Sequence, residues 1–248
     1  MVIEPESRAP RAFPPTRESL VLAMTSADPG QRRMGLEMLV TAYWRPAYAH
    51  LRLRWRLEPA DAEDRVQEFF TVALDQEFFR EYDPAQSRFR SFLRLCLDRF
   101  AAKARRAEHR LKRGGDAEHL SLDFVAAELA LEVPRGGETD DEAFDTEWVR
   151  ALFDWAIDSL GSECRDEGHE VRFTVFEQYD LAPADDGSRP TYRVLAERLG
   201  IPETQVTNHL AWCRRRLRAL LLDRLRNLCG SEAEFQEEAR ALFGTARR

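Results

Sequence analysis

The sequence predicts an all-α protein made of two small helical domains, the second with a helix-turn-helix, joined by an acidic flexible linker. Apolar residues recur at spacings of three and four over most of the chain, which is the period of an amphipathic helix. Glycine and proline, which interrupt helices, number only 12 each among 248 residues. No segment keeps the alternation of apolar and polar residues that a half-buried strand requires.

The first predicted domain covers residues 17–113 and follows a proline-rich N-terminus, residues 1–16, that is expected to be disordered. The turn Asp28-Pro29-Gly30 separates its first two helices. A third helix is expected over 59–75 and a fourth over 87–112.

Residues 114–145 form the predicted linker, because acidic residues mix there with Pro134 and two glycine pairs. One short helix is expected within it, at 121–131. The second domain and a C-terminal extension follow at 146–229 and 230–248, the extension with one amphipathic helix.

The net charge of −7 hides blocks of opposite sign. Residues 88–113 carry ten basic and two acidic side chains, and residues 188–229 carry nine basic and three acidic. Between them, residues 121–187 carry four basic and 19 acidic side chains. The whole chain is therefore not a simple polycation that coats nucleic acid, yet it holds two basic modules separated by an acidic segment.

Several classes of protein are disfavoured by what the sequence lacks. No apolar run approaches the roughly 18 residues that cross a bilayer, and the N-terminus lacks the apolar core of a secretory signal. The four cysteines lie far apart without a Cys-x-x-Cys pair, so neither a zinc site nor a disulfide framework is expected. No catalytic constellation emerges either. We expect a cytoplasmic protein without enzymatic activity, metal or cofactor.

The segment 191–221 carries the pattern of a helix-turn-helix. Ala196 is small where a second helix crosses, and Gly200 follows where the turn needs a positive φ angle. The exposed side of the second helix is expected to hold Thr204, Gln205, Thr207, Asn208, Arg214 and Arg215. Early polar residues of such a helix meet base edges, and later arginines meet phosphates. Two packed helices with a solvated arginine cluster are the alternative interpretation.

The helix at 87–112 combines aromatic and basic side chains, which together can bind unpaired bases and phosphates. Helical spacing assigns most of its aromatic residues to the core. Phe89 and Arg90, at its start, are expected to be the exposed ones. The basic end from Lys103 to Arg113 is expected to face phosphates.

The helix at 59–75 places Asp61, Asp64 and Glu68 near one another. Because like charges on one helix face repel, this cluster indicates a basic partner surface. A capped first turn, a solvated face and a weakly supported carboxylate or metal site stay open as other interpretations.

The order of these segments resembles a known family. DAEDRVQEFF at 61–70 is followed by FREYDPAQSRFRSFLRLCLDRFAAKARR at 79–106, then by the acidic linker and the helix-turn-helix. This order resembles bacterial RNA polymerase sigma factors of the sigma-70 superfamily, in the extracytoplasmic-function (ECF) group. AYWRPAYAHLRLR at 42–54 is similar to the start of their second conserved region.

The resemblance implies a sigma factor that binds core RNA polymerase, through the β′ clamp and the β flap, and directs it to promoter DNA. The residues that match the clamp-docking helix are Asp61, Glu63, Asp64, Gln67 and Glu68. Those that match the −10 region are Phe89, Arg90, Phe92, Arg94, Arg99, Lys103, Arg105 and Arg106. Those that match the −35 recognition helix are Thr204, Gln205, Thr207, Asn208, Arg214 and Arg215.

The match departs from the family pattern in its −10 helix, and the linker and the C-terminal extension from Gly230 are longer than a minimal member needs. Family members often carry Asn and, four residues later, Asp-Arg in the −10 helix, where Asp98, Ala102 and Lys103 stand here. Control by an anti-sigma factor, by phosphorylation or by the C-terminal extension stays open. A standalone helix-turn-helix regulator that binds duplex DNA without polymerase is the alternative function.

Overall fold

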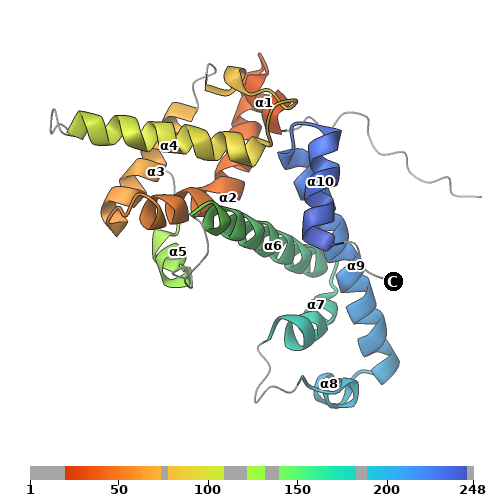
Figure 1. Cartoon of the computed structure of the whole chain (residues 1–248). Coiled ribbons are helices and arrows are strands. Elements are labelled where there is room, and N and C mark those ends of the chain that lie inside the picture. The colour runs from red at the N-terminus through yellow and green to blue at the C-terminus, as the bar shows by residue number, and fades with distance from the viewer. Residues whose placement is uncertain (1–19, 74–77, 109–121, 132–139, 183–188, 245–248) are drawn as a thin grey trace, which may run out of the picture.

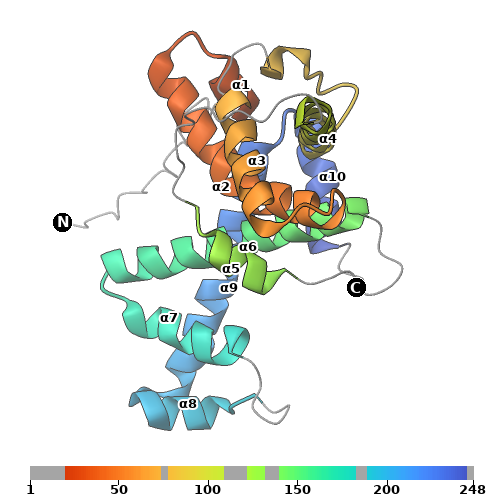
Figure 2. The same ribbon diagram turned by 90° about the vertical axis from the view of Figure 1, so that its left-hand side faces the viewer.

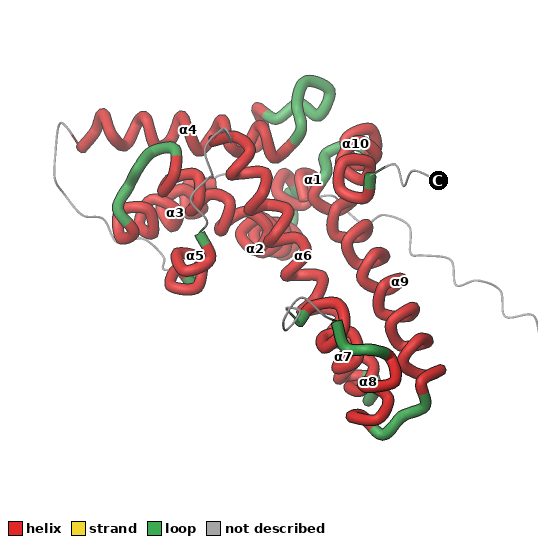
Figure 3. Tube along the Cα trace, turned by 60° about the horizontal axis from the view of Figure 1, so that its bottom comes forward, coloured by secondary structure: helices red, strands yellow, loops and turns green. Residues whose placement is uncertain are grey.

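The computed structural model describes residues 20–73, 78–108, 122–131, 140–182 and 189–244, and every regular element in these ranges is helical (Figures 1 and 3). The all-α prediction is therefore confirmed for the described ranges. The predicted disordered N-terminus lies outside them, as do residues 114–121 and 132–139 of the predicted linker. None of the helices in these ranges has an apolar stretch of the length that a bilayer crossing needs.

The N-terminal helices surround the long helix α2. They are α1 (Leu20–Thr25), α2 (Pro29–Leu53), α3 (Pro59–Ala73), the short 3₁₀ turn η1 (Phe78–Glu81) and α4 (Phe89–Glu108). The predicted turn before α2 is also its cap, because the Asp28 carboxylate accepts a hydrogen bond from the Gly30 N–H at 3.0 Å. Pro29 occupies the first helical position, where its missing N–H costs nothing.

The second half of the chain begins with a helix inside the predicted linker. The elements are α5 (Phe124–Ala130), α6 (Asp140–Asp166), α7 (Glu170–Phe176), the π-helical turn η2 (Glu177–Leu181), α8 (Tyr192–Leu199), α9 (Glu203–Leu228) and α10 (Glu232–Phe243). The short helix expected at 121–131 is confirmed as α5, and it packs on α2 through Phe124, whose ring contacts Trp44 and Tyr48. The π-helical turn was not predicted from the sequence.

Helix α6 connects the two ends of the molecule, because it packs on α2 at one end and on α7 and α9 at the other. Helices α1–α4 lie at one end, and α7 and α8 lie at the opposite end (Figures 1 and 2). Helix α9 runs back from α8 toward the N-terminal helices, and α10 then lies beside the start of α4 (Figure 1).

Buried apolar side chains form one continuous cluster that extends from α1 to α10. At the contact between α2 and α6, Tyr43 stacks on Trp148 with ring centroids 6.5 Å apart. Nearby, His50 meets the edge of Phe144 at 5.8 Å. The helices of the two predicted domains therefore contribute to the same core in this structure.

Candidate nucleic-acid interface

The turn between α8 and α9 has the geometry that the sequence predicts. Gly200 ends α8 in the left-handed region, at φ 64° and ψ 32°, and its N–H donates to the carbonyl oxygen of Ala196. Any residue with a Cβ is strained at that φ angle. Ala196 is buried where the helices meet, and Val206 of α9 is fully buried. Both helices and the turn between them are therefore confirmed.

The first half of α9 presents a polar face to solvent. Glu203 lies in its first turn, where the helix dipole favours an acid. Val206 and Leu210 hold the opposite face against the core. All four predicted base-contacting residues are exposed: Thr204, Gln205, Thr207 and Asn208. Their amide and hydroxyl groups are thus accessible to the base edges of a duplex.

The two predicted phosphate-contacting arginines differ in their surroundings. Arg214 forms two hydrogen bonds with the carboxylate of Asp180, at 2.8 and 2.9 Å, and these bonds raise the pKa of its guanidinium group. Arg215 is exposed and has no ion pair with any residue in the described ranges. A phosphate can therefore reach Arg215 directly but must compete with Asp180 for Arg214.

The start of α4 is buried, which corrects one sequence-based expectation. Phe89 was expected to be exposed, but it is 0% exposed. Its ring packs against Tyr43 at 5.7 Å and Tyr82 at 5.2 Å. Phe92 is also buried and contacts Tyr82 at 5.2 Å. Neither ring is available to stack on a base in this structure.

Arg90 was also expected to be exposed, and it too is enclosed. Its side chain is 12% exposed, with Nε 3.1 Å from the carboxylate of Glu238 and Nη1 3.5 Å from that of Asp145. Its guanidinium group also lies 5.0 Å from the centroid of the Trp148 ring. Burial raises the pKa of Glu238, although Arg90 and Arg88 act against that shift. Helices α6 and α10 therefore cover the first turn of α4.

Helix α10 matches the amphipathic helix expected in the C-terminal extension, but its position over the start of α4 was not predicted. The Glu234 carboxylate accepts hydrogen bonds from the N–H groups of Phe89 at 2.6 Å and Gly230 at 2.7 Å. Arg88 lies 3.0 Å from Glu237. The sequence holds one signal for this contact: the C-terminal amphipathic segment has an acidic face, and the helix at 87–112 is strongly basic.

Exposed cations on α4 lie in its second half. Arg94, nearer the start, is half-buried. The side chain of Arg99 is 65% exposed, and its Nη1 lies 3.9 Å from Glu81. Three further predicted residues of this helix are exposed: Lys103, Arg105 and Arg106. The predicted basic residues at this end of the helix are therefore exposed as far as Arg106, and residues 109–113 lie outside the described ranges.

Helix α3 carries the predicted acidic cluster. Asp61, Asp64 and Glu68 are exposed, and Glu63 is half-buried. Gln67 is instead 8% exposed and belongs to the buried face of the helix. Glu68 is bound by Arg65 at 2.5 Å. Asp61 and Asp64 are therefore accessible to a basic partner, whereas Gln67 is not.

Asp98 occupies the position where the sigma-factor pattern often has asparagine, and it has a structural role here. Its Oδ1 accepts hydrogen bonds from His50 Nε2 and Trp55 Nε1, both at 2.8 Å. Burial acts to raise the pKa of the Asp98 carboxyl, but the two bonds together with the charges of His50 and Arg54 outweigh burial, so the pKa is lowered. A carboxylate therefore anchors two donors that belong to α2 and to the loop after it.

His50 is expected to make stability depend on pH. Burial lowers its pKa below the ordinary value, although the bond to Asp98 opposes this shift. Above the unfolded pKa of about 6.5 both states are neutral, so the stabilisation is complete. As pH falls below that value, the unfolded chain gains a proton that the folded chain resists, and stability is lost. The loss for one proton is at most about 1.4 kcal/mol per pH unit.

Urea unfolding of wild type and His50→Gln between pH 8 and 5 measures this effect. Glutamine can still donate to Asp98 but does not titrate, so the variant should have a shallower pH dependence below pH 6.5. The pKa of His209 is lowered in the same direction, which makes the difference between the two proteins the informative quantity. Identical pH slopes would contradict the prediction.

Within the described ranges, no group of three or more His, Cys, Asp or Glu side chains is arranged to hold a metal ion. Comparison of the chain with protein-family models, with curated proteins and with solved structures gives no match.

Proposed function

We propose that the chain is a sigma factor, a subunit that binds core RNA polymerase and directs it to promoters. The observation that carries the proposal is the exposed polar and basic face of α9, which runs from Thr204 to Arg215 directly after the Gly200 turn. This is the arrangement with which a recognition helix enters a major groove. The order of motifs that resembles ECF sigma factors adds to it.

The other two surfaces take their roles from the same proposal. Helix α3 docks on the basic β′ clamp through Asp61 and Asp64, which are both exposed. The second half of α4 holds the phosphates of the −10 region through Lys103, Arg105 and Arg106. Helix α9 reads the −35 region, in a cytoplasmic setting without membrane or cofactor.

Two helical units joined by an acidic linker are part of this proposal. In the free chain, α6 and α10 cover Arg88 and Arg90 at the start of α4. For these arginines to reach DNA, the units α1–α4 and α6–α9 separate when polymerase binds. Separation lets each unit reach its own promoter element. Deletion of residues 121–145, which hold acidic side chains and α5, should then increase DNA binding by the free protein.

A pull-down with core RNA polymerase tests the function, followed by run-off transcription on genomic fragments. Asp61→Arg combined with Asp64→Arg should weaken binding to core polymerase at least tenfold, because it reverses the charge of the docking face. The matched control is Glu37→Arg, which reverses the charge of an exposed residue on α2. This variant should bind core polymerase normally. No binding of the wild-type chain at micromolar concentration would refute the proposal.

A standalone helix-turn-helix regulator is the second candidate, because the contact face of α9 is already exposed without any partner. Such a regulator shifts a specific duplex tightly by itself in a gel. A sigma factor binds duplex poorly until polymerase is present. The two candidates therefore differ in one gel-shift experiment with and without core enzyme.

Two substitutions on α9 should have different effects on DNA recognition. Asn208→Ala should change the preference at one or two base pairs, with a cost of about 1–3 kcal/mol on the preferred sequence only. Arg215→Ala should weaken binding to all sequences and reduce the slope of log K against log salt by about one. Fluorescence anisotropy of the polymerase complex, on a panel of −35 variants over a salt series, measures both. Equal losses on every sequence for Asn208→Ala would contradict its assignment to base contact.

A further inference from the structure

Two carboxylates of α10 bind the two arginines at the start of α4. Glu237 lies 3.0 Å from Arg88. Glu238 lies 3.1 Å from Arg90 and 3.5 Å from Arg88, and its side chain is only 3% exposed. A phosphate group offers the same kind of negative oxygens to a guanidinium group. The acidic face of α10 therefore occupies a position that also suits a phosphodiester backbone.

A third carboxylate of α10 binds the backbone at the same place. Glu234 accepts a hydrogen bond from the Phe89 N–H at 2.6 Å, and Phe89 is the first residue of α4. The dipole and the free N–H groups at a helix N-terminus favour a negative charge, and phosphates bind there for the same reason. The three carboxylates of α10 thus cover side-chain and backbone donors of residues 88–90.

Helix α10 is held on α9 by a second set of contacts. The guanidinium group of Arg226 lies 4.1 Å from the ring centroid of Phe235, and that of Arg218 lies 4.5 Å from the ring centroid of Phe243. Both arginines belong to α9 and both rings belong to α10. Helix α10 therefore links α9 to the start of α4, and it stays with α9 when its contacts with α4 break.

The contact between α10 and α4 is incompletely hydrogen bonded. Arg90 Nε and Glu238 Oε1 are buried, and neither atom has a hydrogen-bond partner among the described residues. Their ion pair is therefore an attraction of charges without an aligned hydrogen bond. Water satisfies both atoms once the contact opens, whereas leaving them buried costs free energy. The closed contact is consequently less stable than its three carboxylates alone would suggest.

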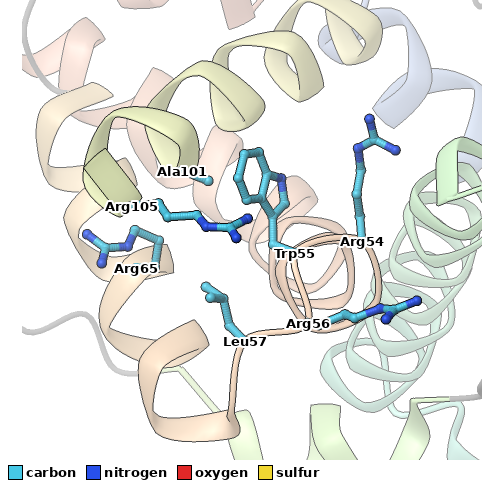
Figure 4. Close-up of a pocket in the computed structure, with 7 residues that line it drawn as sticks. All are labelled: Arg54, Trp55, Arg56, Leu57, Arg65, Ala101 and Arg105. Carbon is cyan, nitrogen blue, oxygen red and sulfur yellow. The ribbon is translucent and has the colours of Figure 1, made fainter. Parts of the chain in front are cut away.

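The opposite end of α4 lies away from α10 (Figure 1). Lys103, Arg105 and Arg106 are exposed there. Figure 4 shows Arg105 at a pocket that Arg54 and Trp55 also line, and no acidic residue is among those that line it in the described structure. The positive charge of α4 is therefore accessible at this end and covered at the other.

We propose that α10 is an autoinhibitory element that competes with the phosphodiester backbone of single-stranded DNA for residues 88–90. In the closed chain, the carboxylates of α10 hold Arg88, Arg90 and the Phe89 N–H. The strand binds there only after α10 has moved away, so its apparent affinity is reduced by the fraction of chains that are open. This inference rests on the proposed function and deepens it, because it names what regulates the start of α4.

Fluorescence anisotropy of a labelled single-stranded oligonucleotide with the full chain tests the proposal without polymerase. Glu238→Gln removes the carboxylate that binds both arginines. It should tighten binding about tenfold, the effect of losing one charge-assisted contact in the closed state. Glu232→Gln removes the same charge from α10, but this residue lies beside Arg226 of α9. As the matched control, it should change binding less than about twofold.

Gly230→Ala should open the same contact without changing any charge. A Cβ at Gly230 would lie 2.5 Å from the Tyr82 hydroxyl, and the Tyr82 ring is itself packed against Phe89 and Phe92. The added methyl group should therefore displace α10 and also tighten oligonucleotide binding about tenfold. Gly30→Ala is the control, because a Cβ there makes only contacts of 3.6 Å or more. Circular dichroism of each variant checks that the fold is retained.

Removing the covered arginines separates uncovering from a general rise in affinity. Arg88→Gln combined with Arg90→Gln should abolish the gain of Gly230→Ala. Arg105→Gln, at the accessible end of α4, should instead weaken wild type and Gly230→Ala by the same factor.

Three results would overturn the proposal. The first is no gain in either Glu238→Gln or Gly230→Ala. The second is an equal gain in the two control variants, and the third is a gain that survives without Arg88 and Arg90. The pull-down with core polymerase tests the proposed function separately. A chain that shows these gains but does not bind polymerase would refute the sigma-factor function and leave the autoinhibition standing.

Discussion

Replacing Trp148 by alanine should lower the free energy of unfolding by about 3–5 kcal/mol, the range for removing a large aromatic side chain from a core. Trp148 lies in α6 and is 2% exposed. Its ring stacks on Tyr43 of α2, and the guanidinium group of Arg90 of α4 lies over the same ring. Removal of this one side chain therefore removes packing contacts among three helices that are distant in sequence. Urea unfolding followed by circular dichroism measures the loss.

Leu129→Ala is the control for this substitution. Leu129 lies on α5 and is 84% exposed, so its truncation should change stability by less than about 0.5 kcal/mol. Because the buried cluster is continuous, wild type should unfold in one transition. A Trp148→Ala loss below about 1 kcal/mol, or two separate transitions in wild type, would show that α2 and α6 do not share a core in solution.

The parts of the fold that were predictable from the sequence rest on local signals. Gly200 has a positive φ angle that few other residues adopt, and Asp28 with Pro29 marks a helix start by side-chain chemistry alone. The exposed face of α9 follows from helical periodicity around Val206 and Leu210. In each case the information lies within about ten residues of the feature.

The start of α4 shows why periodicity was insufficient elsewhere. Helical spacing does not reveal that a partner from far along the chain will cover an end turn. Phe89 is buried because Tyr82 and Tyr43 enclose its ring, and Arg90 because Glu238 of α10 pairs with it. These contacts join segments that are separated by up to about 150 residues, so no local pattern encodes them.

Two other candidate site residues differ from expectation in burial or in ion pairing. Gln67 lies beside acidic neighbours in sequence, yet it belongs to the buried side of α3. Arg214 is exposed as expected but is bound by Asp180, which reaches it from a π-helical turn. A single π turn adds one residue to a helical circuit and re-aims the side chains that follow. The residue types were predictable in both cases, and their availability was not.

Replacing Glu234 by alanine should cost about 3 kcal/mol, because its buried carboxylate satisfies donors from three separate segments. It accepts from the N–H groups of Phe89 and Gly230, and from the hydroxyl of Tyr82 at 3.2 Å. Hydrogen bonds to a charged group contribute about 1.5–3 kcal/mol each, and buried donors left without partners add to the loss. The side chain is 7% exposed, so water cannot readily replace it. Urea unfolding measures the change.

Glu237 on the same helix separates this effect from general loss of negative charge. Its contact with Arg88 is at the surface, with the glutamate side chain 54% exposed, so Glu237→Ala should cost less than about 1 kcal/mol. Under the proposed function, Glu234→Ala should also release α10 from the start of α4 and increase binding to −10 single strand by the polymerase complex. Equal stability losses for the two variants would mean that α10 is held by surface charge and not by the buried carboxylate.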